Sequence, residues 1–325
     1  MSGKDLFDRS RLKLSSLSKR IHDIDISVIR PLESKKDKIP DELFHVARRI
    51  KAARQKGASV IFMMGGHVIR SGVQRYIIDM MERKFITCLA TNGSSVIHDF
   101  EFSLIGATTE NVGHYISEGK FGLWEETGLI NDIVAEGAKD DLGLGETIGR
   151  AIERRNCPYR DISIFAAGYR LGVPITVHVG IGYDITYEHP NCDGAAYGAT
   201  SYKDFLKFAR ILENLENGVV MNFGSAVMAP EVYLKALAMA RNIAVQENKE
   251  IKRFVMLVCD LQPLPKNYRC EPPKDHTGYY FRPWKTMLVR TVSDGGESYY
   301  VRAPHAQTIP ALWTALMNDK EDRYV

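Results

Sequence analysis

Residues 58–99 read ASVIFMMGGHVIRSGVQRYIIDMMERKFITCLATNGSSVIHD. The run ASVIFMM is short, apolar and bounded by glycines, which is typical of a buried strand. Residues 71–84 have the apolar spacing of a helix, ITCLA at 86–90 resembles a second strand, and residues 96–105 again have helical spacing. This stretch therefore predicts a strand, a helix, a second strand and a second helix.

The same alternation recurs along the chain. Further helices are expected at 41–56, 163–172, 202–214, 230–241 and 309–317, and further strands at 174–179, 218–223, 253–258 and 298–303. Strands that alternate with helices are joined by right-handed crossovers and form a parallel sheet with both faces covered. We therefore predict an α/β fold with a doubly wound, mostly parallel sheet.

One domain boundary and two irregular stretches are expected. Residues 1–40 are polar and charge-rich, and we expect an arm that packs on the domain or on a neighbouring subunit. Residues 41–325 are expected to form one domain. Within it, the Gly- and acid-rich residues 107–158 predict short helices and loops over one edge of the sheet, and residues 262–296, with five prolines, predict irregular chain.

Composition excludes several classes of protein. With 43 basic and 40 acidic residues the net charge is only +3, and the basic residues are scattered, so nucleic acid is not an expected partner. Five widely spaced cysteines favour a reducing compartment. No stretch approaches the roughly 20 apolar residues of a membrane helix. We expect a cytoplasmic protein without a membrane partner.

Two small-residue loops are candidates for ligand binding. Ligands of open parallel sheets bind beyond the carboxyl ends of the strands. Gly65, Gly66 and His67 follow the first quoted strand, and the segment Thr91 to Ser95 follows the second. Glycines allow a phosphate or ribose to approach the main chain, although tight turns with capping serines would look the same. We expect the turns containing Gly66 and Asn92 to lie side by side and form a pocket for a dinucleotide.

The predicted strand 174–179 and the loop after it form the most polar cluster in the chain, with His178 in the strand and Asp184, Glu188, His189 and Asp193 in the loop. Its carboxylates could hold a cationic amine or, with the histidines, a metal ion. The spacings fit no closed metal motif. Since His178 lies inside an apolar run, a hydrogen-bonded core histidine is favoured over a ligand.

The segment 58–106 resembles the deoxyhypusine synthases. Residues 65–72 stand where those enzymes have a T-S-N-L-I-S-S-G loop, and residues 91–99 where they have T-A-G-G-V-E-E-D, with Gly72, Val96 and Asp99 identical. The likeness continues through GVPITVHVGIGYD at 172–184, NFGSAVMAPE at 222–231 and YVRAPHAQTIPAL at 300–312. It covers most of the chain from Asp41 onward.

This resemblance implies a Rossmann-like subunit of a homotetramer that binds NAD near a dimer interface. In that family NAD takes a hydride from the polyamine spermidine, and a lysine forms an imine with the aminobutyl group. By position, the resemblance implies catalytic roles for Lys285, His98 and Asp184. It implies cofactor contacts from Gly65, Gly66, His67, Arg70, Asn92, Gly93, Ser94, Asp99, Asp260 and His305.

Several positions depart from the family pattern. Pro230 stands where a histidine would handle protons, Pro304 replaces an aspartate, and Trp284-Lys285 lacks the glycine of the family's W-G-K motif. An imine-forming lysine must be partly neutral, whereas Lys285, flanked by Arg282 and Pro283, could as easily be solvated. Hypusine formation itself is therefore not expected.

Three hypotheses follow. The first is an NAD-dependent transferase or oxidoreductase acting on a polyamine or other amine, and we favour it because both small-residue loops follow strands. The second is a metal-assisted hydrolase or lyase that uses His178, Asp184 and His189, with His98 or Asp99. The third is a ligand-binding protein that has lost the reaction. Fold class alone does not choose among them.

Overall fold

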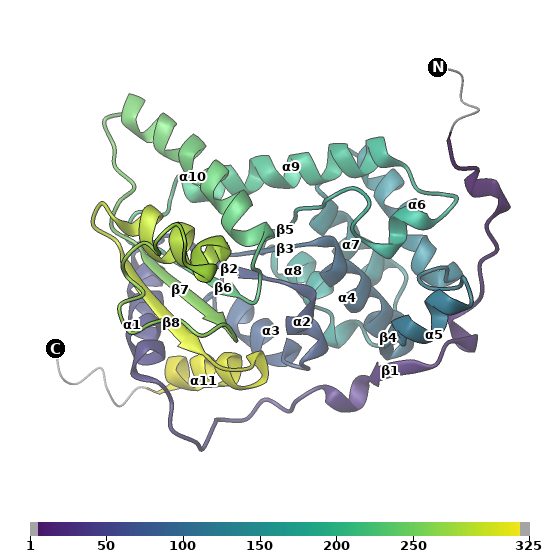
Figure 1. The fold of residues 1–325 in the computed structure, drawn as a ribbon, viewed down its shortest axis with the longest axis horizontal. Coiled ribbons are helices and arrows are strands. Elements are labelled where there is room, and N and C mark those ends of the chain that lie inside the picture. The colour runs from purple at the N-terminus through teal and green to yellow at the C-terminus, as the bar shows by residue number, and fades with distance from the viewer. Residues whose placement is uncertain (1–5, 319–325) are drawn as a thin grey trace.

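Six parallel strands form the central sheet of the protein (Figure 1). A computed structural model describes residues 6–318. In sheet order the strands are β5 (Ile175–Val177), β3 (Cys88–Thr91), β2 (Val60–Met64), β6 (Val219–Phe223), β7 (Val255–Asp260) and β8 (Glu297–Arg302). All five pairings are parallel. The predicted α/β fold is confirmed.

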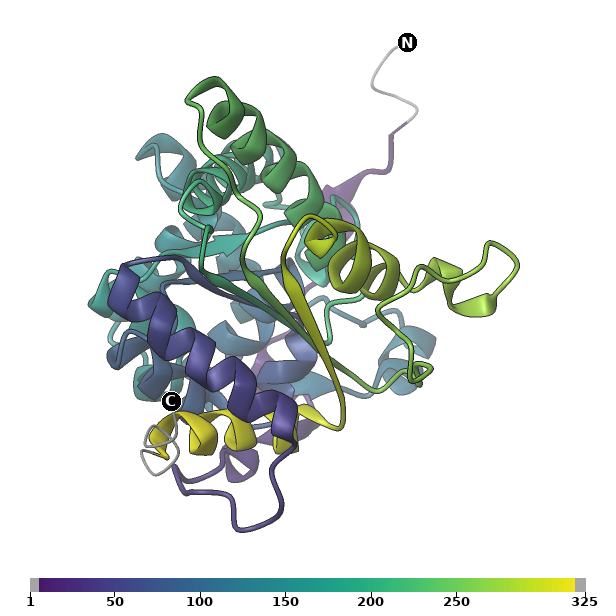
Figure 2. The same ribbon diagram turned by 90° about the vertical axis from the view of Figure 1, so that its left-hand side faces the viewer.

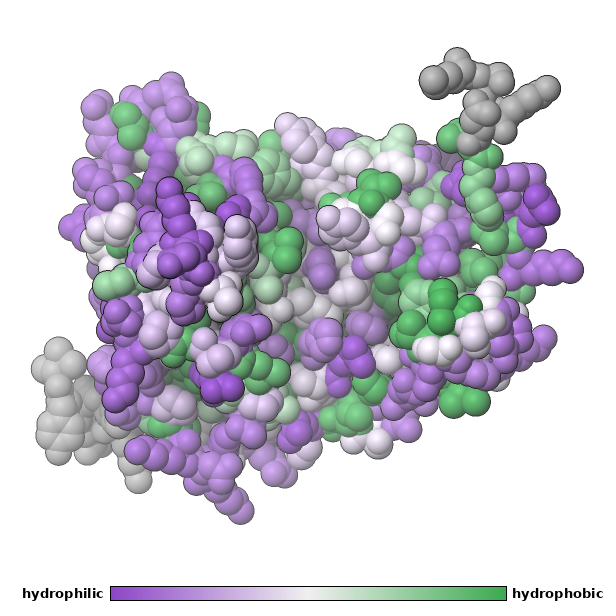
Figure 3. Space-filling model, in the orientation of Figure 1, coloured by the Kyte–Doolittle hydropathy of each residue, from purple (hydrophilic) through white to green (hydrophobic). Residues whose placement is uncertain are grey.

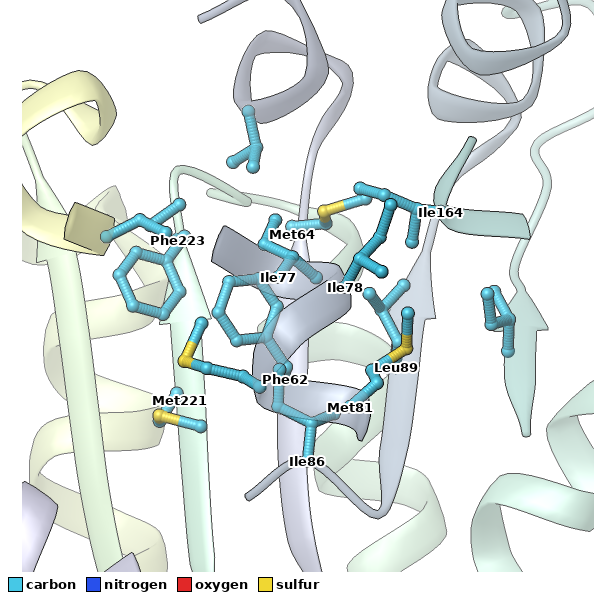
Figure 4. Close-up of a cluster of buried hydrophobic side chains, with 14 of the residues drawn as sticks. Phe62, Met64, Ile77, Ile78, Met81, Ile86, Leu89, Ile164, Met221 and Phe223 are labelled. Atoms are coloured by element: carbon cyan, nitrogen blue, oxygen red, sulfur yellow. The ribbon is translucent and has the colours of Figure 1, made fainter. Parts of the chain in front are cut away.

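Side chains along each strand point alternately to the two faces of the sheet, and helices cover both faces. Both sets of side chains are therefore buried. In β2, Phe62 and Met64 point into one apolar core while Ile61 and Met63 point into the other. Across the middle of the sheet, Phe62 stacks on Phe223 of β6 with ring centroids 4.5 Å apart (Figure 4). This explains why the predicted strands read as continuous apolar runs.

Helices cover the two faces as separate layers (Figure 2). The first core is shared by α1 (Asp41–Lys56), α3 (Gln74–Glu82), α4 (Gly93–Ile105), α8 (Ile164–Leu171) and α11 (His305–Met317). The second is covered by α9 (Gly194–Leu212), α10 (Met228–Gln246) and the π-helix Pro283–Val289. The short helix α2 (Gly66–Arg70) follows β2 directly, and 3-10 turns occur at Arg9–Arg11, Leu17–Lys19, Ile26–Val28, Arg160–Ile162, Ile185–Glu188, Thr277–Tyr280 and Arg290–Val292.

Some predicted boundaries differ from the structure. The helix expected at 71–84 is α3, which begins only at Gln74 because Gly72 adopts a left-handed backbone with φ 73°, and α2 is a separate short helix before it. A Cβ atom at this glycine would also collide with the carbonyl of Val28. Helix α9 begins at Gly194, eight residues before the predicted start, where the Asp193 carboxylate accepts hydrogen bonds from the N–H groups of Ala195 and Ala196.

The expectation of short helices and loops at 107–158 is wrong. After β4 (Ala107–Glu110) and α5 (Val112–Ser117), the segment forms the full-length helices α6 (Glu125–Lys139) and α7 (Leu144–Arg154). Their glycines lie at close contacts: a Cβ atom on Gly137 would collide with Thr147, and one on Gly145 with the carbonyl of Ile175. Glycine here permits close packing and does not interrupt the helices.

The N-terminal arm packs along its own domain. Strand β1 (His22–Asp25) pairs with β4 in an antiparallel two-stranded sheet, with Ile24 opposite Thr108. Leu17 and Arg20 of the arm are buried. Within residues 6–318, no helix combines the length and apolar character that crossing a membrane requires.

Candidate functional site

The sheet has a topological switch between β2 and β6. From β2 the chain continues to β3 on one side, and from β6 it continues to β7 on the other, so the loops after these neighbouring strands diverge. Open α/β sheets bind ligands at such a point of the carboxyl edge. Gly65 and Gly224 lie there, and a Cβ atom on Gly65 would lie 3.5 Å from the carbonyl oxygen of Gly224.

The turns containing Gly66 and Asn92 do lie side by side, but the space between them is closed. A Cβ atom on Gly66 would lie 2.5 Å from Ser94 Oγ and 3.0 Å from His98 Cδ2. The expected pocket between the turns is therefore wrong, since these two side chains fill it. The open space lies beside the turns, on the side of α4.

A cavity of about 240 Å³ occupies that side. Its walls come from α2, α4, the end of β4, the start of α5, the loop after β5 and the arm. The lining residues are Arg20, Arg70, Ser94, Ile97, His98, Glu101, Thr109, Glu110, Val112, Phe121, Tyr183, Asp184 and Ile185. Val112 and Tyr183 are 54% and 85% exposed, and Figure 3 shows an apolar patch over α5. The cavity thus combines a polar interior with an apolar mouth.

Asp184 supplies an unpaired carboxylate to this cavity. Burial alone raises its pKa to about 6, and within residues 6–318 the carboxylate caps no backbone N–H group and accepts no hydrogen bond from another side chain. The carboxylate lies against Gly93, the first residue of α4, where the positive end of a helix dipole favours negative charge. A carboxylate in this position is suited to pairing with a cationic amine.

His98 is joined to Glu101 by a chain of hydrogen bonds through Thr108. Its Nδ1 lies 2.9 Å from Thr108 Oγ1, which lies 2.8 Å from Glu101 Oε2. Arg20 makes a bidentate ion pair with Glu101, at 2.9 and 2.7 Å. Burial lowers the pKa of His98 to about 4, so the imidazole is neutral near neutral pH.

Arg70 and Thr109 line the same cavity, and each also has an unsatisfied polar atom that is closed off from solvent. Arg70 Nε and Thr109 Oγ1 are buried and lack hydrogen-bond partners in the described part of the chain. Thr109 also has a left-handed backbone, with φ 67°. Because β-branched residues rarely adopt this conformation, it marks a strained position of the kind often found at functional sites. A ligand anion would satisfy the guanidinium.

The loops after β6, β7 and β8 form the other half of the carboxyl edge. Gly224 has φ 66°, and a Cβ atom there would lie 2.3 Å from His305 Nε2. His305 Nδ1 is buried without a partner among residues 6–318, while the carboxylate of Asp260 accepts from the N–H groups of Leu261 and Gln262. The close approach to Gly224 is thus made by the His305 ring, and contacts from Gly65, Gly66, His67, Asp260 and His305 to a dinucleotide stay a prediction.

Asn92 and Asp99 have structural partners. Asn92 caps α4, its side-chain oxygen accepting from Ser95 N at 3.4 Å. Asp99 is buried and accepts from Ser163 Oγ at 2.5 Å and from the backbone N–H of Ile164 at 2.9 Å, so it caps α8. The structure therefore does not bring Asp99 to the cavity, and we leave it out of the proposed cofactor contacts.

Lys285 is also remote from the cavity that holds His98 and Asp184. It lies in the π-helix beside β7 and β8, is only 4% exposed, and places Nζ 3.4 Å from the centre of the Tyr279 ring. The alternative of a solvated lysine is therefore wrong. Within one chain, the three expected catalytic residues do not meet, because only two of them line the same cavity.

The histidines of the metal hypothesis have other partners. Nε2 of His178 lies 3.0 Å from Thr176 Oγ1, and the ring packs against Phe208, as expected for a core histidine. Nε2 of His189 donates to the carbonyl of Gly122 at 2.8 Å. Across residues 6–318, no three His, Cys, Asp or Glu side chains gather as a metal site would require. The geometry does not support the metal hypothesis.

Sequence reasoning missed Arg20, Glu101, Thr108 and Thr109. One signal was present: Ser94, His98 and Glu101 recur at intervals of four and three residues, which places them on one face of α4, whereas Asp99 falls on another. Arg20 and Thr108 had no comparable signal, because their contacts depend on pairing between β1 and β4, which lie far apart in the sequence.

Comparison with known proteins places the fold. Residues 44–142 match the family model for the C-terminal Rossmann fold of arginine dihydrolase ArgZ-like proteins. The crystal structure of AgrE with ornithine and NAD+ is similar with a TM-score of 0.50 and 15% identity, covering 85% of this chain and 32% of that one. A LOR/SDH protein of Methanococcus maripaludis S2 gives a TM-score of 0.51 and 14% identity, covering 88% and 70%. At these identities the likeness shows the fold alone.

Curated relatives are similar in sequence at low identity. The deoxyhypusine synthase-like proteins of Chlorobaculum parvum and Chlorobaculum tepidum are each 21% identical over 229 residues, which is 63% of this chain. The matched region spans 64% of the length of those relatives.

Proposed function

Since this chain is a distant relative of the deoxyhypusine synthase-like proteins, we propose that it is an NAD-dependent enzyme that oxidises a small amine. The observation that carries this proposal is the cavity beside α4, in which unpaired Asp184 and neutral His98 line one space next to the glycine turns. Ornithine and NAD+ together in AgrE, which shares the fold, support the pairing of an amine with this cofactor.

The charges of the cavity favour an amine that also carries an anionic group. Asp184 would pair with the ammonium group, and Arg70, whose Nε lacks a partner among the described residues, would pair with a carboxylate. Of the other lining carboxylates, Glu101 pairs with Arg20 and Glu110 accepts hydrogen bonds from Trp124 Nε1 and the Gly122 N–H, so within residues 6–318 neither of them pairs with Arg70. We therefore place amino acids ahead of spermidine as substrates.

Each residue has a distinct role in such an oxidation. NAD would supply the hydride acceptor. Asp184, with a pKa of about 6, would accept the proton that the amine nitrogen releases as the carbon–nitrogen double bond forms. His98, with a pKa of about 4, is too weak a base for that step and would orient the amine by accepting an N–H hydrogen bond.

Oxidation is favoured over transfer through a lysine imine. Lys285 packs on Tyr279 and does not line the cavity, and no other lysine is among the lining residues. A transfer reaction would need a nucleophilic amine within reach of the oxidised carbon. Transfer to an added amine, with a covalent lysine adduct trapped by borohydride, would overturn this preference.

Thermal unfolding with added ligands tests the proposal. A ligand that binds only the folded state raises the melting temperature by mass action. We expect a shift with millimolar NAD, a further shift with ornithine or lysine, and reduction of NAD at 340 nm when a substrate is included. Absence of any shift with NAD would refute the proposal. Light scattering of the same sample would test the predicted homotetramer.

A further inference from the structure

We propose that the N-terminal arm fixes the tautomer of His98: Arg20 and Glu101, acting through Thr108, hold the proton on Nδ1 and leave the Nε2 lone pair for the ligand. Arg20, Glu101 and Thr108 are positioning residues, because none of them needs to touch the reacting atoms. The importance of this for catalysis rests on the proposed function, but the tautomer itself does not.

The direction of the hydrogen bonds follows from Glu101. Burial alone would raise its pKa, yet the hydrogen bonds and charge of Arg20, with those of Thr127 and Thr108, hold the pKa below its ordinary value. Glu101 is therefore an ionised carboxylate, which accepts hydrogen bonds and donates none. Arg20 donates to both of its oxygens, and Thr127 Oγ1 donates at 2.6 Å.

Thr108 then has only one way to bond. Its single hydroxyl proton goes to Glu101 Oε2 at 2.8 Å, so the oxygen can only accept from the nitrogen on its other side. That nitrogen is Nδ1 of His98 at 2.9 Å, which must carry the proton. Since burial keeps the ring neutral, Nε2 is left as an acceptor.

The arm supplies both supports of this arrangement. The side chain of Arg20 is 1% exposed, and its Nε donates to His22 Nδ1 at 3.0 Å while its other two nitrogens donate to Glu101. The backbone of Thr108 is held by β1, in which Ile24 lies directly opposite. Without Arg20, Glu101 would be a buried carboxylate without its counter-ion, and it would gain a proton that it could donate to Thr108.

We expect this tautomer to select ligands that donate a hydrogen bond to Nε2 of His98. An amine N–H can bond to Nε2 of His98, whereas a carbonyl oxygen in the same place would face a lone pair. The opposite tautomer would reverse this preference without moving any atom of the ring.

Nitrogen-15 spectra of histidine-labelled protein test the tautomer directly, since protonated and unprotonated ring nitrogens resonate far apart. His98→Gln identifies the signals among the nine histidines of the chain. We expect the wild type to show a protonated Nδ1 and an unprotonated Nε2. Thr108→Val should shift the population toward protonated Nε2, and Thr108→Ser should restore the wild-type spectrum.

Thr109→Val is the matched control, because the hydroxyl of Thr109 has no hydrogen-bond partner in the described part of the chain. It should leave the His98 signals unchanged. Arg20→Gln, which removes the charge of the arm, should act like Thr108→Val if the variant folds, as checked by its melting temperature.

A wild-type spectrum with protonated Nε2 would overturn the proposal, whatever the ligands do. Unchanged His98 signals in folded Arg20→Gln would remove the role of the arm. The proposed function fails separately, through the absence of an NAD shift. In the expected outcome, Thr108→Val reduces the thermal shift given by ornithine at least threefold while the shift given by NAD stays the same.

Discussion

The carboxylate of Asp184 lies against the backbone of Gly93, so that a Cβ atom on the glycine would be 2.2 Å from Oδ2. Residue 93 begins helix α4 and residue 184 follows strand β5, and their contact joins two loops of the carboxyl edge. Only glycine, which has no side chain, leaves room for the Asp184 carboxylate at the start of α4.

Gly93→Ala should therefore displace the carboxylate and weaken amine binding. The carboxylate can rotate away, so we expect stability to change by no more than about 1 kcal/mol, while the thermal shift given by an amine falls at least threefold. Gly198→Ala in α9 is the matched control, because nothing lies within 4 Å of its Cβ position. It should stabilise the protein by roughly 0.5–1 kcal/mol and leave amine binding intact.

Asp184→Asn should abolish the charge that holds the amine. Loss of a charged hydrogen bond is worth about 1.5–3 kcal/mol, or roughly 10- to 100-fold in affinity, and calorimetry would measure it. NAD affinity should be unchanged. Equal losses for both ligands would show that Asp184 supports the whole carboxyl edge and does not bind the amine specifically.

Amine binding should depend on pH through Asp184. Only the ionised carboxylate pairs with an ammonium group, so affinity should fall about tenfold per pH unit below about 6. The folded pKa exceeds the ordinary value of 3.8, which means that the folded state holds this proton more tightly. Stability from this group is therefore present at low pH and is lost as pH rises to about 6. Asp184→Asn should flatten the binding profile, and titrations of amine affinity from pH 4.5 to 8 would reveal an unaltered slope if another group is responsible. The stability profile should lose only the share of Asp184, because burial also raises the pKa of Asp99 to about 6 and that of Asp204 to about 7.

Asp99→Ala should destabilise the protein without affecting ligands. The substitution removes the buried cap of α8 and leaves Ser163 Oγ and the N–H of Ile164 without their acceptor. We expect a loss of about 1–3 kcal/mol in the free energy of unfolding by urea. Loss of NAD binding in the folded variant would restore Asp99 to the candidate site.

Lys285→Met should retain the response to NAD and to amines. Methionine keeps much of the side-chain volume beside Tyr279 while removing the amine. After incubation with substrate and borohydride, mass spectrometry of the wild type should find no adduct on Lys285. An adduct on Lys285 that is absent from Lys285→Met would show that the reaction is a transfer through a lysine imine.

The sequence predicted what depends on local pattern. Helix α1 begins and ends where predicted, at Asp41 and Lys56, because its apolar spacing and the closing Gly57 are local signals. The glycines of α6 and α7 misled the prediction, since only their neighbours in space, such as Thr147 beside Gly137, explain them. In the site, the loops that contain Gly66 and Asp184 could be predicted because each follows a predicted strand. The contact between Arg20 and Glu101 could not, because 81 residues separate them in the sequence and no local pattern predicts it.

The ribbon formed by β1 and β4 makes the first part of the chain a structural partner of a strand some eighty residues later. A shortened protein that starts at Asp41 would keep the sheet and both apolar cores, yet it would present β4 with unpaired backbone groups. Exposed strand edges recruit other strands. Such a shortened protein should self-associate through residues 107–110, and attempts to graft the Rossmann-like core onto another scaffold would succeed only if the arm is carried with it.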